Sequence, residues 1–334
     1  MTKIKKILSF VLITVFSVVA ILVLCSCTPD EKEYHGNGVY ATLYHNGRAT
    51  VYAFDKSTDV GWYNGQTCIV PDTIYYSGNT YTVTTFGNID HHLTALVVDG
   101  GHAGEIVIPE TVTNIYWDGY LLSDTYDYLE RITVASDNTF YRSVNGALYN
   151  KDGTELLLYP PAKRDTTFVV PGELVHISQK HYNYCNKYIQ NIEVQEGNES
   201  FSVIDNVLYS ADGKTLVYVP AGHGDSLALP DGVNFIGYCA LRYANIVNLY
   251  IPQHIWRDEI NDYQVIMRFY QDDYLDLSDY HPFRYVHNIY CYDGELPHFL
   301  ERANLPYTQF HLGVSRDDFD KMISDAEQGD IFSL

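Results

Sequence analysis

Residues 144–163 read VNGALYNKDGTELLLYPPAK, and sixty positions later residues 204–222 read IDNVLYSADGKTLVYVPAG. The same offset relates Ile132 to Ile192 and Asn138 to Asn198 upstream of the two stretches. A fixed internal period is typical of a solenoid, in which each unit buries its apolar face by stacking on its neighbours. The repeat therefore predicts an extended binding surface rather than one deep catalytic pocket.

A shorter pattern runs inside the long one. Five segments have the spacing apolar-x-x-apolar-x-apolar, and three further short segments end in proline. The five are Leu93/Leu96/Val98, Leu129/Ile132/Val134, Ile189/Ile192/Val194, Ile246/Leu249/Ile251 and Val286/Ile289/Cys291, and the three are Ile108-Pro109, Val170-Pro171 and Leu229-Pro230. Apolar residues two apart point to the same side of a strand, so each segment predicts a short strand facing the stack. The steps from the proline-ended strands to the next are 26, 24 and 22 residues, within the range of a leucine-rich repeat.

The residue types add a family resemblance. It is carried by the two quoted stretches together with VPDTIYYSGNTYTVTTFG (70–87), IPETVTNI (108–115) and LPDGVNFIGYCALRYANIVNLYIP (229–252). Across about residues 65–292 the chain resembles the BspA-like leucine-rich repeat proteins. The resemblance implies a β-rich leucine-rich repeat solenoid, a right-handed superhelix of short parallel strands with inserted β-hairpins, capped at both ends. The family usually carries a Gly-Cys near the middle of each repeat, whereas here only Cys185 lies near that place and Cys239 comes several residues early. Residues 116–128 fit poorly, and the match fades beyond Pro252.

The N-terminus predicts export. Lys3, Lys5 and Lys6 precede an apolar run from Ile7 to Leu24, as in a secretory signal. The following Leu24-Cys25-Ser26-Cys27 resembles a lipobox, which implies cleavage before Cys27 and acylation of that cysteine. The alternative is an uncleaved membrane helix, because the run is just long enough to span the hydrocarbon core. Both alternatives place residues 34–334 outside the cytoplasm, and the acidic run after Cys27 resembles the export signals of surface lipoproteins, which favours the outer membrane facing the cell surface.

Composition narrows the class of partner. The net charge is −21, with 21 basic against 42 acidic residues, which excludes the basic patches that nucleic acids and anionic membranes require. The lipid is thus the only expected membrane contact. The chain also has 46% apolar residues and 31 tyrosines, as expected for a folded, β-rich protein rather than a disordered acidic one.

Four cysteines remain after processing besides Cys27. They are Cys68, Cys185, Cys239 and Cys291, and neighbouring ones lie 52 or more residues apart. Export permits disulfides, but distant repeats of a solenoid do not touch. Buried thiols that act as small apolar residues are the favoured alternative to bridges.

The expected layout has five parts. In order, these are a lipoprotein signal peptide (1–26), an acylated Cys27 with a polar tether (27–38), an N-terminal β cap (39–69), leucine-rich repeats (70–292) with a divergent insertion (253–285), and a C-terminal cap with a terminal helix (293–334). Asn46-Gly47, Asp152-Gly153 and Asp212-Gly213 predict β-hairpin turns. Ser315-x-x-Asp318 resembles a capping box at the start of a helix whose apolar stripe would seal the last coil.

Three patterns suggest catalysis or metal binding, and each has a simpler explanation. Gly224-Asp225-Ser226-Leu227 spells the nucleophile block of GDSL esterases, yet no histidine downstream has an aspartate three residues before it, and a nucleophile without a base is inert. Adjacent histidines such as His91-His92 point to opposite faces of a strand and make a poor metal site. The Asp-Gly pairs lack the spacing of calcium loops. We expect no enzyme activity, metal or cofactor.

The candidate binding face consists of the residues between the apolar positions of the repeat strands. We expect them to point outward on neighbouring parallel strands and to form one continuous face. They are Arg131, Thr133, Asn191, Glu193, Asn248, Tyr250, Asn288 and Tyr290, a polar and aromatic mixture that interfaces favour. The alternative is that these side chains are merely solvated and that inserted loops bind the ligand.

The expected function is a lipid-anchored, extracytoplasmic binding module. The resemblance implies recognition of a protein or of host matrix, as in adhesion. The alternative is a glycan-binding accessory lipoprotein of a nutrient-uptake system, since 48 aromatic residues could supply sugar-stacking surfaces. The partner is thus a protein or a glycan at the cell surface.

Overall fold

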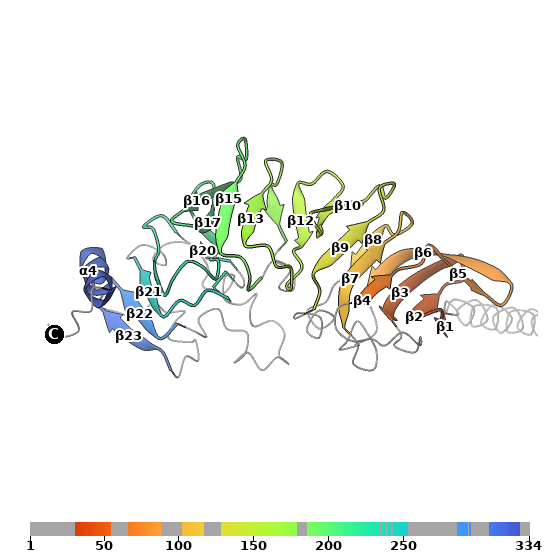
Figure 1. Cartoon of the computed structure of the whole chain (residues 1–334), viewed down its shortest axis with the longest axis horizontal. Helices are drawn as coiled ribbons and strands as arrows, with labels where there is room; N and C mark the ends of the chain where they lie inside the picture. Colours follow the sequence, from red (N-terminus) through yellow and green to blue (C-terminus); the bar gives the residue numbers. More distant parts are fainter. Residues whose placement is uncertain are drawn as a thin grey trace, which may run out of the picture.

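The structure is a computed structural model of the whole chain. It describes residues 31–54, 66–87, 102–116, 128–178, 186–233, 235–237, 240–241, 243–252, 286–292, 294 and 307–327. In Figure 1 the strands follow one another along an elongated arc, from β1 at one end to helix α4 at the other. This order in space follows the order in sequence, as expected when each segment packs on its neighbours.

The arc begins with a six-stranded sheet. Its strand order is β1-β2-β3-β6-β5, and β8 also pairs with β6. The bounds are β1 Lys32–Gly36, β2 Val39–Leu43, β3 Arg48–Phe54, β5 Thr73–Tyr76, β6 Asn79–Gly87 and β8 Asn114–Tyr116. The turn at Asn46-Gly47 joins β2 to the antiparallel β3, as predicted. Gly87 has φ +107, and a Cβ there would lie 1.8 Å from the carbonyl oxygen of Tyr116, so the close approach of β8 requires glycine.

Two of the boundaries expected from the sequence differ in the structure at the N-terminal end of the arc. Strand β1 lies inside residues 27–38, which the sequence assigned to a tether, because its residues pair with β2 along their whole length. Strand β4 (Gln66–Ile69) was assigned to the antiparallel cap, yet it pairs in parallel with β7. The parallel arrangement therefore starts before residue 70.

Three parallel ladders carry the repeat strands. The first is β4-β7-β9, the second is β13-β15 and the third is β19-β21-β22-β23. Their bounds are β7 Ala103–Ile108, β9 Arg131–Val134, β13 Thr167–Val170, β15 Asn191–Val194, β19 Ser226–Ala228, β21 Asn248–Ile251, β22 Asn288–Cys291 and β23 Gln309–Leu312. Each proline-ended strand pairs with the apolar-x-apolar strand after it, which confirms the strand pattern read from the sequence for the described segments.

Two four-stranded sheets alternate with the ladders. Their orders are β10-β11-β12-β14 and β16-β17-β18-β20. The bounds are β10 Tyr141–Val144, β11 Ala147–Asn150, β12 Glu155–Leu158, β14 His176–Ile177, β16 Phe201–Ile204, β17 Val207–Ser210, β18 Thr215–Tyr218 and β20 Phe235–Ile236. The hairpins predicted at Asp152-Gly153 and Asp212-Gly213 join β11 to β12 and β17 to β18.

The sixty-residue period is visible in the pairing itself. Leu148 pairs with Leu158, Leu208 pairs with Tyr218, and the register shifts directly after each of the two leucines. Both leucine side chains are 0% exposed. The prediction that Leu148 and Leu208 occupy equivalent buried positions is therefore confirmed.

The hairpins interrupt the row of parallel strands. On the edge of β9 away from β7, the N–H of Ile132 donates to the carbonyl of Gly146 in the β10–β11 turn, at 2.8 Å. Sixty residues on, the N–H of Ile192 donates to Oδ1 of Asn206 in the β16–β17 turn, at 2.9 Å. A hairpin turn thus occupies the edge position where the next repeat strand would have paired, so the ladders stay separate.

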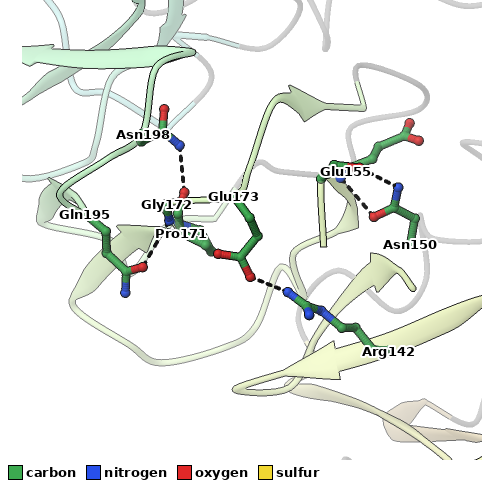
Figure 2. A network of polar contacts seen from close by, with 9 residues as sticks. Arg142, Asn150, Glu155, Pro171, Gly172, Glu173, Gln195 and Asn198 are labelled. Atoms are coloured by element: carbon green, nitrogen blue, oxygen red, sulfur yellow. Dashed lines mark hydrogen bonds and ion pairs between the residues drawn. The ribbon is translucent and has the colours of Figure 1, made fainter. Parts of the chain in front are cut away.

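Asparagines with buried or half-buried side chains tie successive coils together. The side-chain amide of Asn138 donates to the carbonyls of Pro109 and Val112, and its Oδ1 accepts from the N–H groups of Phe140 and Tyr141. Asn198 repeats these four bonds one period later. Figure 2 shows the first of them, to the carbonyl of Pro171. Asn186 makes the same set. Each of these amides satisfies backbone groups that would otherwise be unpaired.

The core forms a chain of three clusters rather than one centre. One is built around Val51, Ile106 and Leu148, one around Leu156, Phe168 and Leu208, and one around Leu216, Leu249 and Ile289. Cys68 and Cys291 are 1% and 2% exposed and remain thiols. For these two cysteines the prediction of buried thiols acting as apolar residues is confirmed.

Helix α4 (Arg316–Glu327) ends the described chain. The Ser315 hydroxyl accepts from the N–H of Asp318 at 3.2 Å and donates to Oδ2 of Asp318 at 2.6 Å, so the predicted capping interaction is confirmed. Its position differs from expectation. Phe319 packs on the outward side chains of β21 and β22, so the helix covers a strand face instead of sealing the end of the stack.

Several predictions lie outside the described residues. These are the signal peptide and Cys27, the segment Leu93/Leu96/Val98, His91-His92, Cys185 and Cys239, and the insertion at 253–285. Within the described part of the chain, no helix is long and apolar enough to cross a membrane.

Candidate functional site

The predicted face residues are distributed over all three ladders. Arg131 and Thr133 lie on β9, Asn191 and Glu193 on β15, Asn248 and Tyr250 on β21, and Asn288 and Tyr290 on β22. Only the last four share one ladder. The prediction that these residues form one continuous face is therefore wrong. Hairpin turns separate β9 from β13 and β15 from β19, so the strands belong to different sheets.

On the third ladder the polar side chains form a hydrogen-bonded chain across the strands. Nδ2 of Asn248 donates to the Ser226 hydroxyl at 3.2 Å, and Nδ2 of Asn288 donates to Oδ1 of Asn248 at 2.9 Å. His311 contributes Nε2, 3.2 Å from Oδ1 of Asn288. The two asparagines therefore hold the strands in register, and much of their bonding capacity is used inside the protein.

The aromatic members of this ladder are covered. Tyr250 is 2% exposed, and its ring centroid lies 5.4 Å from that of Phe319 and 5.9 Å from the guanidinium of Arg316. Tyr290 stacks on His311 and meets Phe319 at 5.1 Å. The prediction that Tyr250 is exposed and available to a ligand is wrong, because its ring is buried against Phe319 of α4.

The first ladder keeps its outward face exposed. Across it lie Thr67, Glu105 and Arg131 in one row and Ile69, Val107 and Thr133 in the next. The Glu105 carboxylate accepts from the hydroxyls of Thr67 at 3.2 Å and Thr133 at 2.6 Å. Beside it Ile69 is 63% exposed. A fixed carboxylate, an exposed arginine and an exposed isoleucine thus share one flat surface, which we call the first-ladder face.

The second ladder offers a smaller surface of the same kind. Val169 is 40% exposed and pairs with Glu193, while Thr167 pairs with Asn191. The turn after β13 is held by Gln195, whose Oε1 accepts from the N–H of Gly172 at 3.0 Å (Figure 2). On the other side of this turn Glu173 forms an ion pair with Arg142. Hydrogen bonds from its own backbone and from Arg142 lower the pKa of Glu173, so this edge of the turn stays charged at neutral pH.

A cavity of about 310 Å³ lies between α4, the β16–β17 hairpin and the segment from His223 to Pro230. We call it the helix cavity. Its apolar wall includes Ile204, Leu227 and Ile323, and its polar wall is formed by Asp205, His223, Ser226, Arg316, Asp320, Ser324 and Glu327. The sequence analysis missed it, because its walls come from segments separated by about a hundred residues, and of its residues only Ser226 had been considered in a chemical pattern.

Ser226 of the GDSL tetrapeptide lies in this wall. Its hydroxyl donates to Oδ1 of Asp225 at 2.8 Å and accepts from Asn248. His223 lines the same cavity, but Nδ1 of this histidine is buried without a hydrogen-bond partner, and burial lowers its pKa. The hydroxyl of Ser226 is therefore bonded to Asp225 and Asn248 and not to a histidine. Among the described residues, no group of three or more metal-ligating side chains comes together.

The comparisons with known proteins give structural likenesses only. No family model matches the chain, and no curated protein matches it. Among solved structures, the pneumococcal vaccine antigen PcpA is 13% identical with a TM-score of 0.37, over 67% of this chain and 65% of that one. The chain thus spans less than two thirds of that antigen.

Two other similar structures are a leucine-rich cell surface protein and a leucine-rich repeat protein. A leucine-rich cell surface protein of Faecalibacterium prausnitzii is 14% identical with a TM-score of 0.30, over 86% of this chain and 97% of that one. A leucine-rich repeat protein of Eubacterium ventriosum is 16% identical with a TM-score of 0.31, over 78% and 84%. Leucine-rich repeat proteins of Bacteroides capillosus and Bacteroides ovatus are also among the similar structures. With such TM-scores, the assignment of the fold rests on the ladders described above.

Proposed function

We propose that the chain is a lipid-anchored, extracytoplasmic leucine-rich repeat protein that binds another protein, such as a host matrix component, through the first-ladder face. The observation that carries the proposal is the chemistry of that face. Ile69 is largely exposed on the edge strand β4, the Glu105 carboxylate on β7 is fixed by two threonines, and Arg131 lies on β9 beyond it. Exposed apolar groups among charged and hydrogen-bonded ones are typical of protein interfaces.

The architecture suits this role. In our proposal the coils form a right-handed solenoid capped at both ends, and the ladders present their faces along it. Strands β1, β2 and β3 precede this first ladder in the chain, so Cys27 with its lipid would anchor the molecule at this end. Residues 27–31 would then be the whole tether, because β1 starts at Lys32.

The binding face is tested with a double substitution. Ile69→Gln with Arg131→Gln removes the apolar and the cationic group without touching the core. The matched control is Val175→Gln with Arg164→Gln, because Val175 is 61% exposed and the Arg164 side chain 71% exposed. We expect the first pair to weaken binding to a protein found on a host-protein array at least tenfold, and the control to leave it unchanged. Equal affinities in two stable variants would overturn the proposal.

A glycan array run in parallel separates this function from the glycan-binding alternative. If the protein binds glycans and no protein on the two arrays, glycan binding replaces protein recognition as the proposed function. Hits that depend on Ile69 and Arg131 would support the first-ladder face whatever the class of ligand.

The anchor is tested separately. Cys27→Ser should abolish fatty-acid labelling of the protein and leave an uncut precursor, because the acyl group is attached to that sulfur. Cys25→Ser is the control and should change neither. Normal maturation of the Cys27 variant would show that the chain is not a lipoprotein.

A further inference from the structure

One edge of the six-stranded sheet gathers the ends of several strands. Lys32, the first residue of β1, lies beside the end of β2, and Arg48 at the start of β3 pairs with Thr82 of β6. Strand β6 begins before Thr82, at Asn79, which pairs with Tyr76 at the end of β5. The start of β1, the β2–β3 turn and the β5–β6 turn therefore lie on the same edge of the sheet. In Figure 1, β1 and β5 lie at the same end of the arc.

This edge, which we call the tether rim, has its own composition. It consists of Lys32, residues 44–48 and residues 75–80, and it contains three tyrosines, two cationic residues and no carboxylate, although the net charge of the chain is −21. Tyr75 is 68% exposed and Tyr76 is 38% exposed. The rings of Tyr34 on β1 and Tyr76 on β5 meet edge to face with centroids 5.8 Å apart, so the two ends of the rim lie together.

The proposed lipid anchor would hold this rim close to a bilayer. Lys32 follows Cys27 by five residues, and a fully extended chain of that length covers at most about 18 Å. The acyl chains on Cys27 would lie in the hydrocarbon layer, which places the sulfur at the membrane surface. Whatever path the intervening residues take, the start of β1 would then stay within that reach.

We propose that the tether rim rests on the headgroup layer of a phospholipid bilayer, with its tyrosine rings at the interface and Lys32 and Arg48 against headgroup phosphates. The proposal rests on the lipid anchor of the proposed function and adds a protein surface to the lipid as a membrane contact. Tyrosine is enriched at membrane–water interfaces because its ring is apolar and its hydroxyl is polar. The rim shares no residue with the first-ladder face.

The charge of the rim suits a bilayer despite the acidity of the chain. At physiological ionic strength the potential of a charged surface decays over about 8 Å. The two cations of the rim would therefore feel the phosphates beneath them, whereas most of the carboxylates of the arc would not.

A protein partner is the main alternative occupant of the rim. Such a partner would have to fit between the bilayer and the start of β1, a gap of at most about 18 Å. A small domain is about 30 Å across. The short tether therefore favours the bilayer itself as the occupant.

The test uses the chain from residue 28 onward, with a histidine tag in place of the acylated cysteine, held on phosphatidylcholine vesicles by a nickel-chelating lipid. The tag makes the tether longer, so the rim stays on the bilayer only if it has affinity for it. Tyr75→Trp places a fluorophore on the rim. Tyr307→Trp is the matched control, because Tyr307 is 88% exposed and lies near β23 at the other end of the arc.

The readout is quenching by phosphatidylcholine that is brominated near the headgroup. The parent chain with its three tryptophans supplies the background, and vesicles without bromine correct for quenching by nickel. We expect bromine to remove about half of the fluorescence added by Tyr75→Trp and to leave that added by Tyr307→Trp unchanged, because only the first residue would lie at the interface.

A charge reversal tests the two cations of the rim. On vesicles that contain phosphatidylglycerol, Lys32→Glu with Arg48→Glu should reduce the quenching of Tyr75→Trp about twofold, because the anionic surface repels the new carboxylates. The control is Lys214→Glu with Lys321→Glu, which makes the same change of charge on exposed side chains away from the rim. This control pair should leave the quenching unchanged.

Two results would overturn the proposal. One is equal quenching at the two tryptophan positions, whether strong or absent, since the bilayer would then not select the rim. The other is a rim reversal that changes the quenching no more than its control pair does. Because the tag replaces the lipid, neither result bears on acylation, which fatty-acid labelling of Cys27 decides separately.

Discussion

At the residue scale, stability depends on buried asparagines that bridge coils. Asn138 is 0% exposed and all four of its amide hydrogen bonds go to backbone groups, two in the preceding proline turn and two in its own turn. No hydrophobic residue can replace this arrangement, since the carbonyls and N–H groups would remain buried without partners.

Asn138→Ala should therefore lower the free energy of unfolding by about 2–4 kcal/mol, the cost of leaving several buried backbone groups unsatisfied. The measurement is urea denaturation followed by far-UV circular dichroism. Asn79→Ala is the control, because Asn79 makes its side-chain hydrogen bond on the surface, and it should stay within about 0.5 kcal/mol of the parent. Equal effects of the two changes would show that the bridging bonds contribute nothing.

Burial also sets the chemistry of Cys68. It raises the pKa of this thiol to about 12, so the reactive thiolate is scarce at pH 8. We expect iodoacetamide to leave Cys68 unlabelled in the folded chain at pH 8 and to label it in urea, as read by peptide mass spectrometry. Rapid native labelling would contradict the burial.

The same shift predicts alkaline sensitivity. The unfolded thiol loses its proton near pH 9, whereas the folded one keeps it to about pH 12. The stabilisation is thus complete below pH 9 and is lost as the pH rises from 9 to 12. Burial raises the pKa of Tyr149 to about 12 as well, with the same sign. The midpoint of urea unfolding should therefore fall steadily over this range.

At the element scale, one aromatic side chain fastens α4. Phe319 is the buried residue of the helix, and it contacts the rings of both Tyr250 and Tyr290. Met322 and Ile323 are only half-buried and Ala326 is exposed, and a 12-residue helix is marginal in water without tertiary packing. The contact therefore decides whether the helix is formed.

Phe319→Ala should release α4, because the lost packing costs about 3–5 kcal/mol locally. Hydrogen exchange followed by mass spectrometry should show lost protection of residues 316–327 with little change in β13 and β15. Lys321→Ala serves as the control. Unchanged protection of α4 in the Phe319 variant would show that other contacts hold the helix.

At the scale of the whole molecule, the two copies of the sixty-residue repeat should contribute similarly to stability. Leu148 and Leu208 are equivalent residues in different core clusters. Truncating either to Ala should cost about 2–5 kcal/mol, measured by urea denaturation, and the two costs should be similar because the surroundings repeat. Phe140→Ala is the control, since Phe140 is 50% exposed. A cost below about 1 kcal/mol for one leucine alone would show that the two repeats are packed differently.

Features that recur at a fixed offset could be predicted from the sequence, whereas the docking of α4, which occurs once, could not. The strands around Ile132, Ile192 and Leu249, the hairpins at the Asp-Gly pairs and the buried leucines follow from local patterns, because the same side chains recur at a fixed offset. The covering of Tyr250 and the helix cavity could not be predicted. They depend on where α4 docks, and a helix with one buried aromatic carries no local signal for the strand it will meet. The separation of the ladders was missed for a related reason, since a hairpin turn that bonds to a strand edge leaves no trace in the strand pattern.

The hairpin turns at the edges of β9 and β15 have a consequence for how such a molecule can lengthen. Because Gly146 and Asn206 occupy the same place one period apart, a further copy of sixty residues inserted between the two would meet surfaces that already fit it on both sides. An inserted single coil would not fit these surfaces, because it would place an unpaired strand edge where a hairpin turn is needed. Gene duplication is therefore expected to add cassettes of two coils, and the length of the molecule would grow in steps of that size.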